Sequence, residues 1–241
     1  MRKIRQKASE VIKFSLSSQV SFVLVGEIII GVVLTLITLF LFLKLGDKVL
    51  DKETIFFDST ITHFIYLFRT PLMTSLMKDI SFFGGEILLG SAIIVTILFL
   101  LKKHKKDALV FAFILIFGIG LNLLLKDMFQ RPRPELMPLV HETSYSFPSG
   151  HAMNSFIFYT CLAFFIFRKM KHKRLKIILM SGSALLIFLI GLSRIYLGVH
   201  YPSDVLAGYT AGLCWFVIVL LFERTIIFFR LFKQRELESP Y

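Results

Sequence analysis

Six long apolar runs constrain this chain more than any other feature of its sequence. A helix that crosses the hydrocarbon core of a membrane needs roughly 20 mostly apolar residues, within a range of about 17–25. The sequence therefore predicts an all-α, polytopic integral membrane protein, folded as a bundle of six transmembrane helices. We place the spans at residues 21–43, 86–101, 108–125, 150–167, 177–193 and 204–222, with the second and fifth extending into their flanks.

The composition excludes the other broad classes of protein. Hydrophobic residues make up 56% of the 241 residues and charged residues only 18%, whereas soluble chains carry roughly 25% charged residues. The mean hydropathy of +0.74 excludes a disordered chain, because disorder needs low hydrophobicity. Two cysteines, Cys161 and Cys214, both lie inside apolar runs, which excludes a disulfide scaffold.

The net charge of +12 follows the predicted membrane topology. Of the 28 Lys and Arg residues, 19 lie in the N-terminus, the C-terminal tail and two short hairpins on the same side. Cytoplasmic loops carry an excess of Lys and Arg, so we expect both termini, including residues 1–20, to be cytoplasmic. Because topology accounts for the positive charge, we predict no nucleic-acid partner.

Residues 44–85 form the longest connection, on the extracytoplasmic side. The part from 55 to 83 is rich in Phe, Ile and Leu but is broken by charged residues and by Pro71. We interpret it as one or two helices that lie in the membrane interface with their apolar faces in lipid. Two roles fit this segment: packing over the bundle, or gating of a substrate.

Polar residues gather in three segments at the outer ends of the predicted spans. These segments are residues 126–134, 147–151 and 193–204. They belong to consecutive hairpins, so a helical bundle can bring them together. We therefore expect residues 126–204 to form the catalytic region of a single membrane-embedded domain over 1–241.

The side chains of these segments suit a phosphate group. Lys126, Arg133 and Arg194 supply three fixed cations, and arginine donates two parallel hydrogen bonds to phosphate oxygens. Ser149 and Gly150 open the fourth predicted span. The N-terminus of a helix binds phosphate through its free backbone N–H groups, and a glycine there lets the backbone approach the ligand closely.

Two histidines and a carboxylate complete the predicted chemistry. Asp204 follows His200 by four residues, so its carboxylate can accept a hydrogen bond from one imidazole nitrogen and leave the other nucleophilic. We expect His200 to attack phosphorus and form a phosphohistidine. His151 then protonates the leaving oxygen and later activates water, while the cations stabilise the transition state. The mechanism needs no metal or other cofactor, and the acidic residues show no recognisable ligand spacing.

The three segments resemble the signature of the type 2 phosphatidic acid phosphatase superfamily. The stretch 138–147, which runs into the second motif, is similar to the bacterial phosphatidylglycerophosphatase B / undecaprenyl-diphosphatase branch. The resemblance implies a nucleophilic histidine in the third motif, an acid/base histidine in the second and phosphate ligands at the other positions. The motifs K-x6-R-P, P-S-G-H and S-R-x5-H-x3-D match at Lys126, Arg133 and Pro134, at Pro148 to His151, and at Ser193, Arg194, His200 and Asp204.

The sequence thus predicts a lipid phosphatase of the bacterial plasma membrane with its active site at the extracytoplasmic face. Its substrate is a lipid phosphate or diphosphate, with undecaprenyl diphosphate first and phosphatidylglycerophosphate next. A lipid phosphotransferase with the same intermediate is the alternative enzyme, and a lipid transporter is the alternative outside enzymes. The sequence leaves open the lipid chain, the preference between mono- and diphosphate, and the oligomeric state.

Several polar or small residues outside the motifs also carry expectations. Glu27 lies a few residues into the first span, within reach of the cytoplasmic interface. Arg131, in a second Arg-Pro pair, is a further candidate for binding the anion, and Asn122 can steady Lys126 or bond between helices. The G-x-x-x-G pattern at Gly208 is a packing seam, either internal or dimeric. Four histidines are expected at the surface: His63, His104, His141 and His172.

Overall fold

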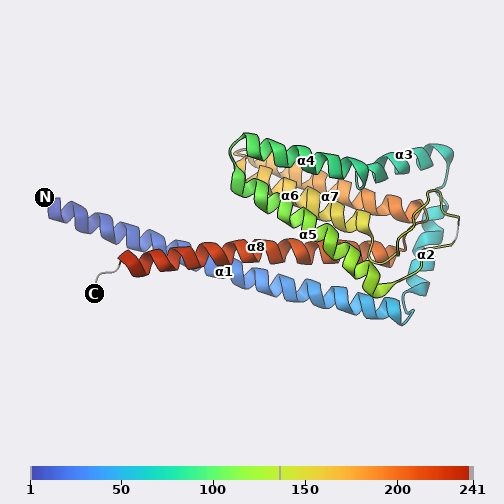
Figure 1. The fold of residues 1–241 in the computed structure, drawn as a ribbon, viewed down its shortest axis with the longest axis horizontal. Coiled ribbons are helices and arrows are strands. Elements are labelled where there is room, and N and C mark those ends of the chain that lie inside the picture. Colours follow the sequence, from blue (N-terminus) through green and yellow to red (C-terminus); the bar gives the residue numbers. More distant parts are fainter. Residues whose placement is uncertain (1, 136, 239–241) are drawn as a thin grey trace. The chain divides into compact units, whose positions relative to one another are not determined.

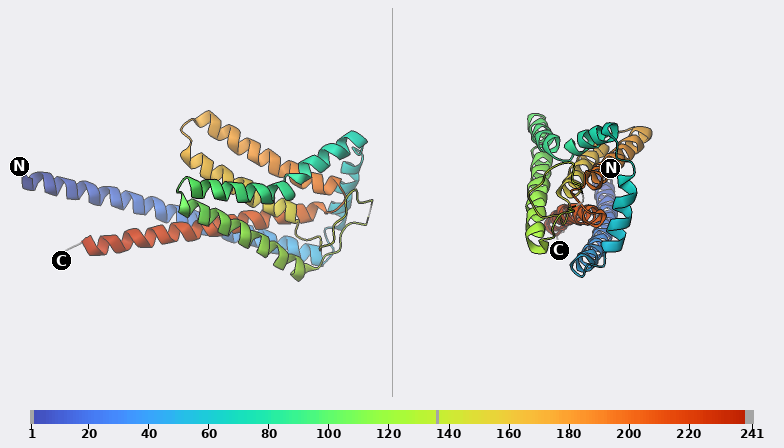
Figure 2. Two further views of the ribbon diagram at one scale, coloured as in Figure 1. Left: turned by 45° about the horizontal axis from the view of Figure 1, so that its top comes forward. Right: turned by 90° about the vertical axis from the view of Figure 1, so that its right-hand side faces the viewer.

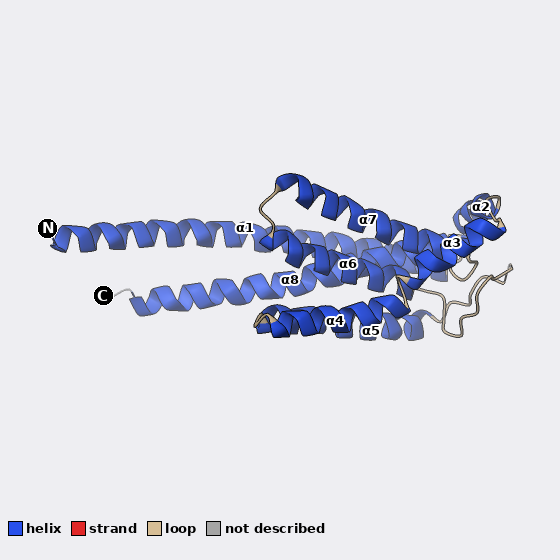
Figure 3. Cartoon of the chain, turned by 90° about the horizontal axis from the view of Figure 1, so that it is seen from above, coloured by secondary structure: helices blue, strands red, loops and turns tan. Residues whose placement is uncertain are grey.

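All the secondary structure of the described residues is α-helical. The computed structural model describes residues 2–135 and 137–238 and has eight helices and no strand within them (Figures 1 and 3). The helices are α1 (Arg2–Leu50), α2 (Ile55–Tyr66), α3 (Pro71–Phe82), α4 (Glu86–Leu101), α5 (Lys105–Phe129), α6 (Gly150–Lys169), α7 (Lys173–Tyr196) and α8 (Pro202–Glu238).

The prediction of six membrane spans is confirmed. Six segments of the described chain are long and apolar enough to cross a membrane: 22–50, 71–101, 105–129, 150–169, 173–196 and 202–233. The second extends upstream of residue 86, as expected of a span that continues into its flank, because α3 leads through a short turn at Gly84 and Gly85 directly into α4. Lys78 and Asp79, which argued against a span there, lie on the exposed side of α3.

The described chain divides into two units. The smaller unit combines residues up to Ile37 with residues from Val217 onward. Within it Glu27 pairs with Arg224, whose Nε lies 3.2 Å from the carboxylate. The acid in the first span therefore has a cationic partner, and this offsets part of the cost of an ionisable group in a membrane segment.

The larger unit, Thr38–Phe216, contains the bundle that carries the motifs. Helix α6 packs between α5 and α7, α4 packs on α5, and the short helices α2 and α3 contact α7 (Figures 1 and 2). Phenylalanine rings fill this interior: Phe111 of α5 meets Phe158 of α6 edge to face, with 5.8 Å between ring centroids. Such edge-to-face pairs add stability beyond the area that they bury.

The G-x-x-x-G pattern is an internal seam between α8 and α6. A Cβ atom at Gly208 would lie 2.7 Å from the carbonyl oxygen of Ser149, and one at Gly212 would lie 3.1 Å from that of Met153. The two helix backbones therefore approach more closely than any larger residue would allow. This close packing places the start of α8 beside the start of α6.

The long connections of the larger unit all lie at one end of the bundle. Residues 51–54, 67–70, 130–149 and 197–201 meet there, whereas the basic hairpins after α4 and α6 lie at the other end (Figures 1 and 2). Residues 44–85 contain the end of α1 and two short helices, α2 and α3, in agreement with the helices expected there. All three motif segments thus reach the same end of this unit.

Candidate active site

A cavity of about 340 Å³ brings residues of all three motif segments together. Its polar wall contains the predicted site residues Lys126, Arg133, Gly150, His151 and His200. Its apolar wall is formed by side chains of α4 and α5: Leu88, Leu89, Ile119 and Leu123. The sequence prediction that the bundle joins these segments is confirmed by the structure.

The local sequence explains why helix α5 ends within the first motif. Helix α5 ends at Phe129, and Gln130 adopts a left-handed conformation with φ of 46° that closes the last turn. Pro132 and Pro134 then prevent the helix from continuing. Lys126 therefore stays on the last turn of α5, while Arg133 lies on the loop that follows.

His200 is buried in the wall of the cavity, with only 2% of its surface exposed. Its Nδ1 lies 3.5 Å from Oδ2 of Asp204, so the predicted pairing of these two residues is present, although the contact is long for a hydrogen bond. Its Nε2 lies 3.3 Å from Nη1 of Arg133. A proton on Nδ1 therefore faces the carboxylate, and the lone pair of Nε2 is directed toward a cation.

Burial lowers the pKa of His200 from 6.5 to about 4. Asp204 opposes this shift by stabilising the protonated form, whereas Arg133 and Arg194 add to it by repelling a charged imidazole. His200 is therefore neutral at pH 7, the state in which an imidazole can act as a nucleophile.

Oxygen acceptors hold the three candidate phosphate-binding cations, of which Lys126 and Arg133 line the cavity and Arg194 lies behind its lining residue Glu142. Lys126 donates from Nζ to the carbonyl oxygen of Tyr145. Arg133 donates to the carbonyl oxygens of Val199, at 2.7 Å, and Ser144, at 2.6 Å, and burial lowers its pKa. Because backbone carbonyls fix these side chains, their charges are in place before any ligand binds.

A carboxylate that no spacing in the sequence signals lies beside Arg194. Glu142 of the loop before α6 forms an ion pair with Nη2 of Arg194, and its other oxygen lies 3.7 Å from Arg133. Ser81 of α3 accepts a hydrogen bond of 2.6 Å from Nη1 of the same arginine. A protein carboxylate thus contacts two of the three cations predicted to hold phosphate.

The N-terminus of α6 faces the cavity through Gly150. A Cβ atom there would lie 2.9 Å from the side-chain oxygen of Asn122, so a larger residue would collide. The Ser149 hydroxyl is buried and caps the helix by accepting from the N–H of Ala152 at 3.4 Å. Asn122 donates to the carbonyl oxygen of Pro148, which supports its alternative role in bonding to a neighbouring segment.

His151, on the first turn of α6, lines the same cavity. The turn between α3 and α4 packs against it: a Cβ atom at Gly85 would lie 2.9 Å from Nε2 of the imidazole. The absence of a side chain at Gly85 therefore leaves room for this histidine.

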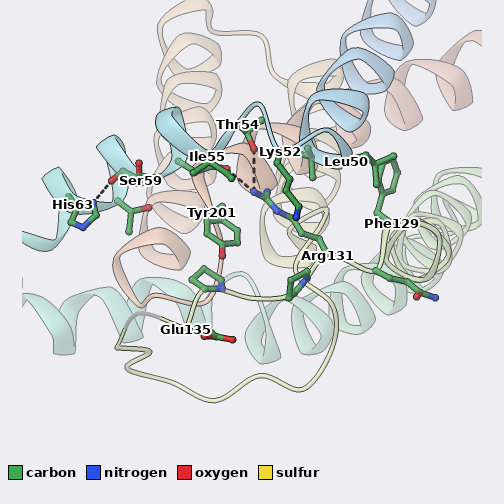
Figure 4. A pocket seen from close by; sticks show the side chains of 16 residues that line it. Leu50, Lys52, Thr54, Ile55, Ser59, His63, Phe129, Arg131, Glu135 and Tyr201 are labelled. Carbon is green, nitrogen blue, oxygen red and sulfur yellow. Dashed lines mark hydrogen bonds and ion pairs between the residues drawn. The ribbon is translucent and has the colours of Figure 1, made fainter.

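Arg131 points away from this cavity, although its motif position resembles that of Arg133. It lines a second cavity of about 530 Å³, formed by the end of α1, by α2 and by the loop after α5 (Figure 4). Burial alone would lower the pKa of Arg131, but the carboxylates of Asp204 and Asp58 raise it above its ordinary value. Arg131 lines this second cavity and not the one that contains Arg133 and the two histidines, so the geometry does not support its predicted share in binding the anion.

The remaining predictions concern surface histidines and metal ligands. The four histidines expected at the surface are exposed. Among the residues that the structure describes, no group of three or more His, Cys, Asp or Glu side chains is arranged to hold a metal ion.

The chain is similar to known proteins of one family. The PAP2 superfamily model matches residues 107–228. Phosphatidylglycerophosphatase B of Bacillus subtilis is 37% identical over 180 residues, which cover 72% of this chain and 86% of that protein. A putative undecaprenyl-diphosphatase of Escherichia coli is 40% identical over 77 residues, or 31% of this chain and 33% of that protein.

The fold is similar to a solved membrane enzyme. The crystal structure of a transmembrane PAP2-type phosphatidylglycerolphosphate phosphatase from Bacillus subtilis matches with a TM-score of 0.73 and 31% identity, covering 80% of this chain and 96% of that chain.

The Glu142 contact leads to a prediction about anion binding. Glu142→Gln should bind orthophosphate about tenfold more tightly than the wild type, because it removes a like charge from the place where the anion meets Arg194 and Arg133. Calorimetric titration of the purified protein in detergent measures this change.

Glu135→Gln is the matched control, since Glu135 lies on the same loop but lines the other cavity. Its affinity for orthophosphate should equal that of the wild type. Unchanged or weaker binding by Glu142→Gln would show that the carboxylate does not compete with the anion.

Proposed function

We propose that this protein hydrolyses a lipid phosphate or diphosphate through a phosphohistidine on His200. The premise is that the chain belongs to the PAP2 superfamily and is a membrane lipid phosphatase. The observation that carries the assignment is the buried, neutral imidazole whose Nε2 faces Arg133 at 3.3 Å in a cavity with an apolar wall. Asp204 keeps the proton on Nδ1, which makes Nε2 the attacking atom.

Lys126, Arg133 and Arg194 bind the phosphate, together with backbone N–H groups at the start of α6. The charges of Lys126 and Arg133 are already fixed by carbonyl oxygens, so they stabilise the equatorial oxygens of the transition state without reorganising. Ser149 acts by capping α6 and Gly150 by admitting the ligand to the backbone.

His151 lines the same cavity as the nucleophile and serves as acid and then as base. In the first step the bond from phosphorus to the lipid oxygen breaks, and His151 gives that oxygen a proton. In the second step it takes a proton from water, which attacks phosphorus and releases His200. General acid–base catalysis of this kind contributes about 10²–10⁴-fold to a rate.

The apolar wall favours a lipid substrate over a soluble ester. Leu88, Leu89 and Leu123 border the same cavity as the catalytic histidines, so an alkyl or prenyl chain can lie against α4 and α5 while its phosphate reaches His200. We propose undecaprenyl diphosphate and phosphatidylglycerophosphate as the substrates, in line with the names of the relatives in Bacillus subtilis and Escherichia coli.

We propose a single membrane domain over residues 1–241 with residues 126–204 as its catalytic region. Both termini, including residues 1–20, face the cytoplasm of a bacterial cell. Within residues 44–85, the part between the first two candidate spans, 51–70, lies in the extracytoplasmic interface. The support is the uneven distribution of Lys and Arg in the sequence. The partners are the lipid phosphate and the surrounding membrane lipids.

One experiment tests the function as a whole. Purified protein in detergent should release phosphate from a prenyl diphosphate and from phosphatidylglycerophosphate in the presence of EDTA, because fixed cations neutralise the phosphate. Activity that EDTA abolishes and Mg²⁺ restores would contradict the mechanism. Radiolabel passed to an added lipid alcohol instead of water would favour the phosphotransferase, and no turnover of any lipid phosphate would favour the transporter.

The sidedness has its own test. In a variant without Cys161 and Cys214, a cysteine at the exposed loop position His141 should react with an impermeant thiol reagent in intact cells, because the motif loops face outward. Labelling that requires opened cells would reverse the orientation.

Alanine variants of the two histidines should lose phosphatase activity at different steps. His200→Ala removes the atom that bonds to phosphorus, so it should trap no label from a ³²P-labelled activated substrate. His151→Ala removes a proton donor that a good leaving group hardly needs, so it should still form the phosphoenzyme but release phosphate slowly. The measurement is acid-labile, base-stable label on each variant, and label on His200→Ala without label on His151→Ala would reverse the two roles.

A further inference from the structure

Asp204 is a fully buried carboxylate with partners on several sides. Its Oδ1 accepts from Nη1 of Arg131 at 2.5 Å. Its Oδ2 accepts from the backbone N–H of Tyr201 at 2.8 Å and from the hydroxyl of Ser146, and lies 3.5 Å from Nδ1 of His200. The arginine thus holds one oxygen and leaves the other for the histidine and the chain around it.

The other end of the Arg131 guanidinium binds a second buried carboxylate. Asp58 of α2 accepts from Nη2 of Arg131 at 2.8 Å and is only 2% exposed. The same carboxylate accepts from the backbone N–H of Ser203 at 2.8 Å and from its hydroxyl at 2.7 Å. Asp58 therefore fixes the first turn of α8, one residue before Asp204.

The chain Asp58–Arg131–Asp204 alternates in charge and leads to the neutral His200. Both carboxylates and the imidazole are buried, and Arg131 is half-buried. A buried carboxylate without a partner is strongly unfavourable, and one cation here stabilises two of them. Figure 4 shows Arg131 between α2 and the loop that carries Tyr201, with Thr54 as a further acceptor at 3.3 Å. Asp58 lies outside residues 107–228, the part that the superfamily model matches.

We propose that Asp58 and Arg131 are positioning residues for the Asp204–His200 pair. This inference rests on the proposed function, in which His200 attacks phosphorus and Asp204 orients it. Arg131 fixes the carboxylate at the distance and angle that keep Nε2 of His200 toward the phosphate site, and Asp58 fixes Arg131. Neither residue touches the substrate, because Arg131 and Asp58 line the second cavity.

The first test separates positioning from binding. Arg131→Gln should lower kcat about 10–100-fold, the scale found for outer partners that orient a histidine at metal sites, and should leave KM within about threefold. Asp58→Asn keeps the shape of the side chain and should lower kcat by a smaller factor. The double variant should be no slower than Arg131→Gln alone, because both act through one path.

The second test is the pH profile of kcat/KM, which a purely structural role would not move. Removing Arg131 takes a cation from Asp204, so a proton on the Asp204–His200 pair becomes more favourable. The acidic limb of the profile should therefore move to higher pH in Arg131→Gln. The charged groups that face the pair are Lys126 from α5, Arg131 and Arg133 from the loop after it, Glu142 from the loop before α6, His151 from α6, Arg194 from α7 and, through Arg131, Asp58 from α2.

The third test uses the second cavity, whose volume of about 530 Å³ gives a small cation access to the site of Arg131. Millimolar methylguanidinium should raise the kcat of Arg131→Ala at least tenfold and should leave the kcat of the wild type unchanged. Lys52→Gln is the matched control, because Lys52 lines the same cavity and makes no contact with Asp204 in the described structure. It should keep wild-type kcat and show no rescue.

The outcomes distinguish this inference from the function on which it rests. All variants are assayed in detergent, and kcat is compared only among variants whose melting temperature equals that of the wild type. If Asp204→Asn and His200→Ala keep full activity, the proposed function fails. If those two are inactive while Arg131→Gln keeps wild-type kcat and an unmoved acidic limb, only the positioning role fails. A KM increase without a kcat loss in Arg131→Gln would instead assign Arg131 to substrate binding and overturn the inference.

Discussion

The burial of charge at one end of a membrane bundle is the constraint on which this structure depends. Asp204 is completely buried, and a carboxylate there is stable only with donors around it. Those donors come from the loop after α5, the loop before α6 and the loop before α8. The carboxylate that orients the candidate nucleophile is therefore also what ties three separate segments together.

Small residues make this convergence sterically possible. Gly208 and Gly212 let α8 approach α6 until its backbone meets that of Ser149 and Met153, and Gly85 leaves space for His151. Apolar packing alone associates helices weakly within a membrane, so close backbone contact and the polar network at the bundle end support each other.

The sequence predicted the spans and the meeting of the motifs, because hydropathy and hairpin order are local properties. The second span was expected to extend into its flanks, but its continuation through α3 could not be predicted, because Lys78 and Asp79 interrupt the apolar run. The roles of Asp58 and Glu142 could not be predicted: each pairs with an arginine 73 or 52 residues away, and no local spacing signals such a contact. The contact of Ser203 with Asp58 was likewise not predicted, and its place next to Asp204 in the sequence was the one sign that Ser203 lies near the site.

The repeated Arg-Pro pair places its two arginines in different surroundings. Residues two apart in a regular extended strand point to the same side, but residues 130–135 form no regular strand, and Arg131 and Arg133 line different cavities. Arg131 faces carboxylates that are permanent parts of the protein, whereas Arg133 is held by carbonyl oxygens and faces His200. An arginine neutralised by two carboxylates has little charge left to attract phosphate. Arg133, whose one carboxylate contact is the longer one to Glu142 at 3.7 Å, is better suited to a ligand that must bind and leave.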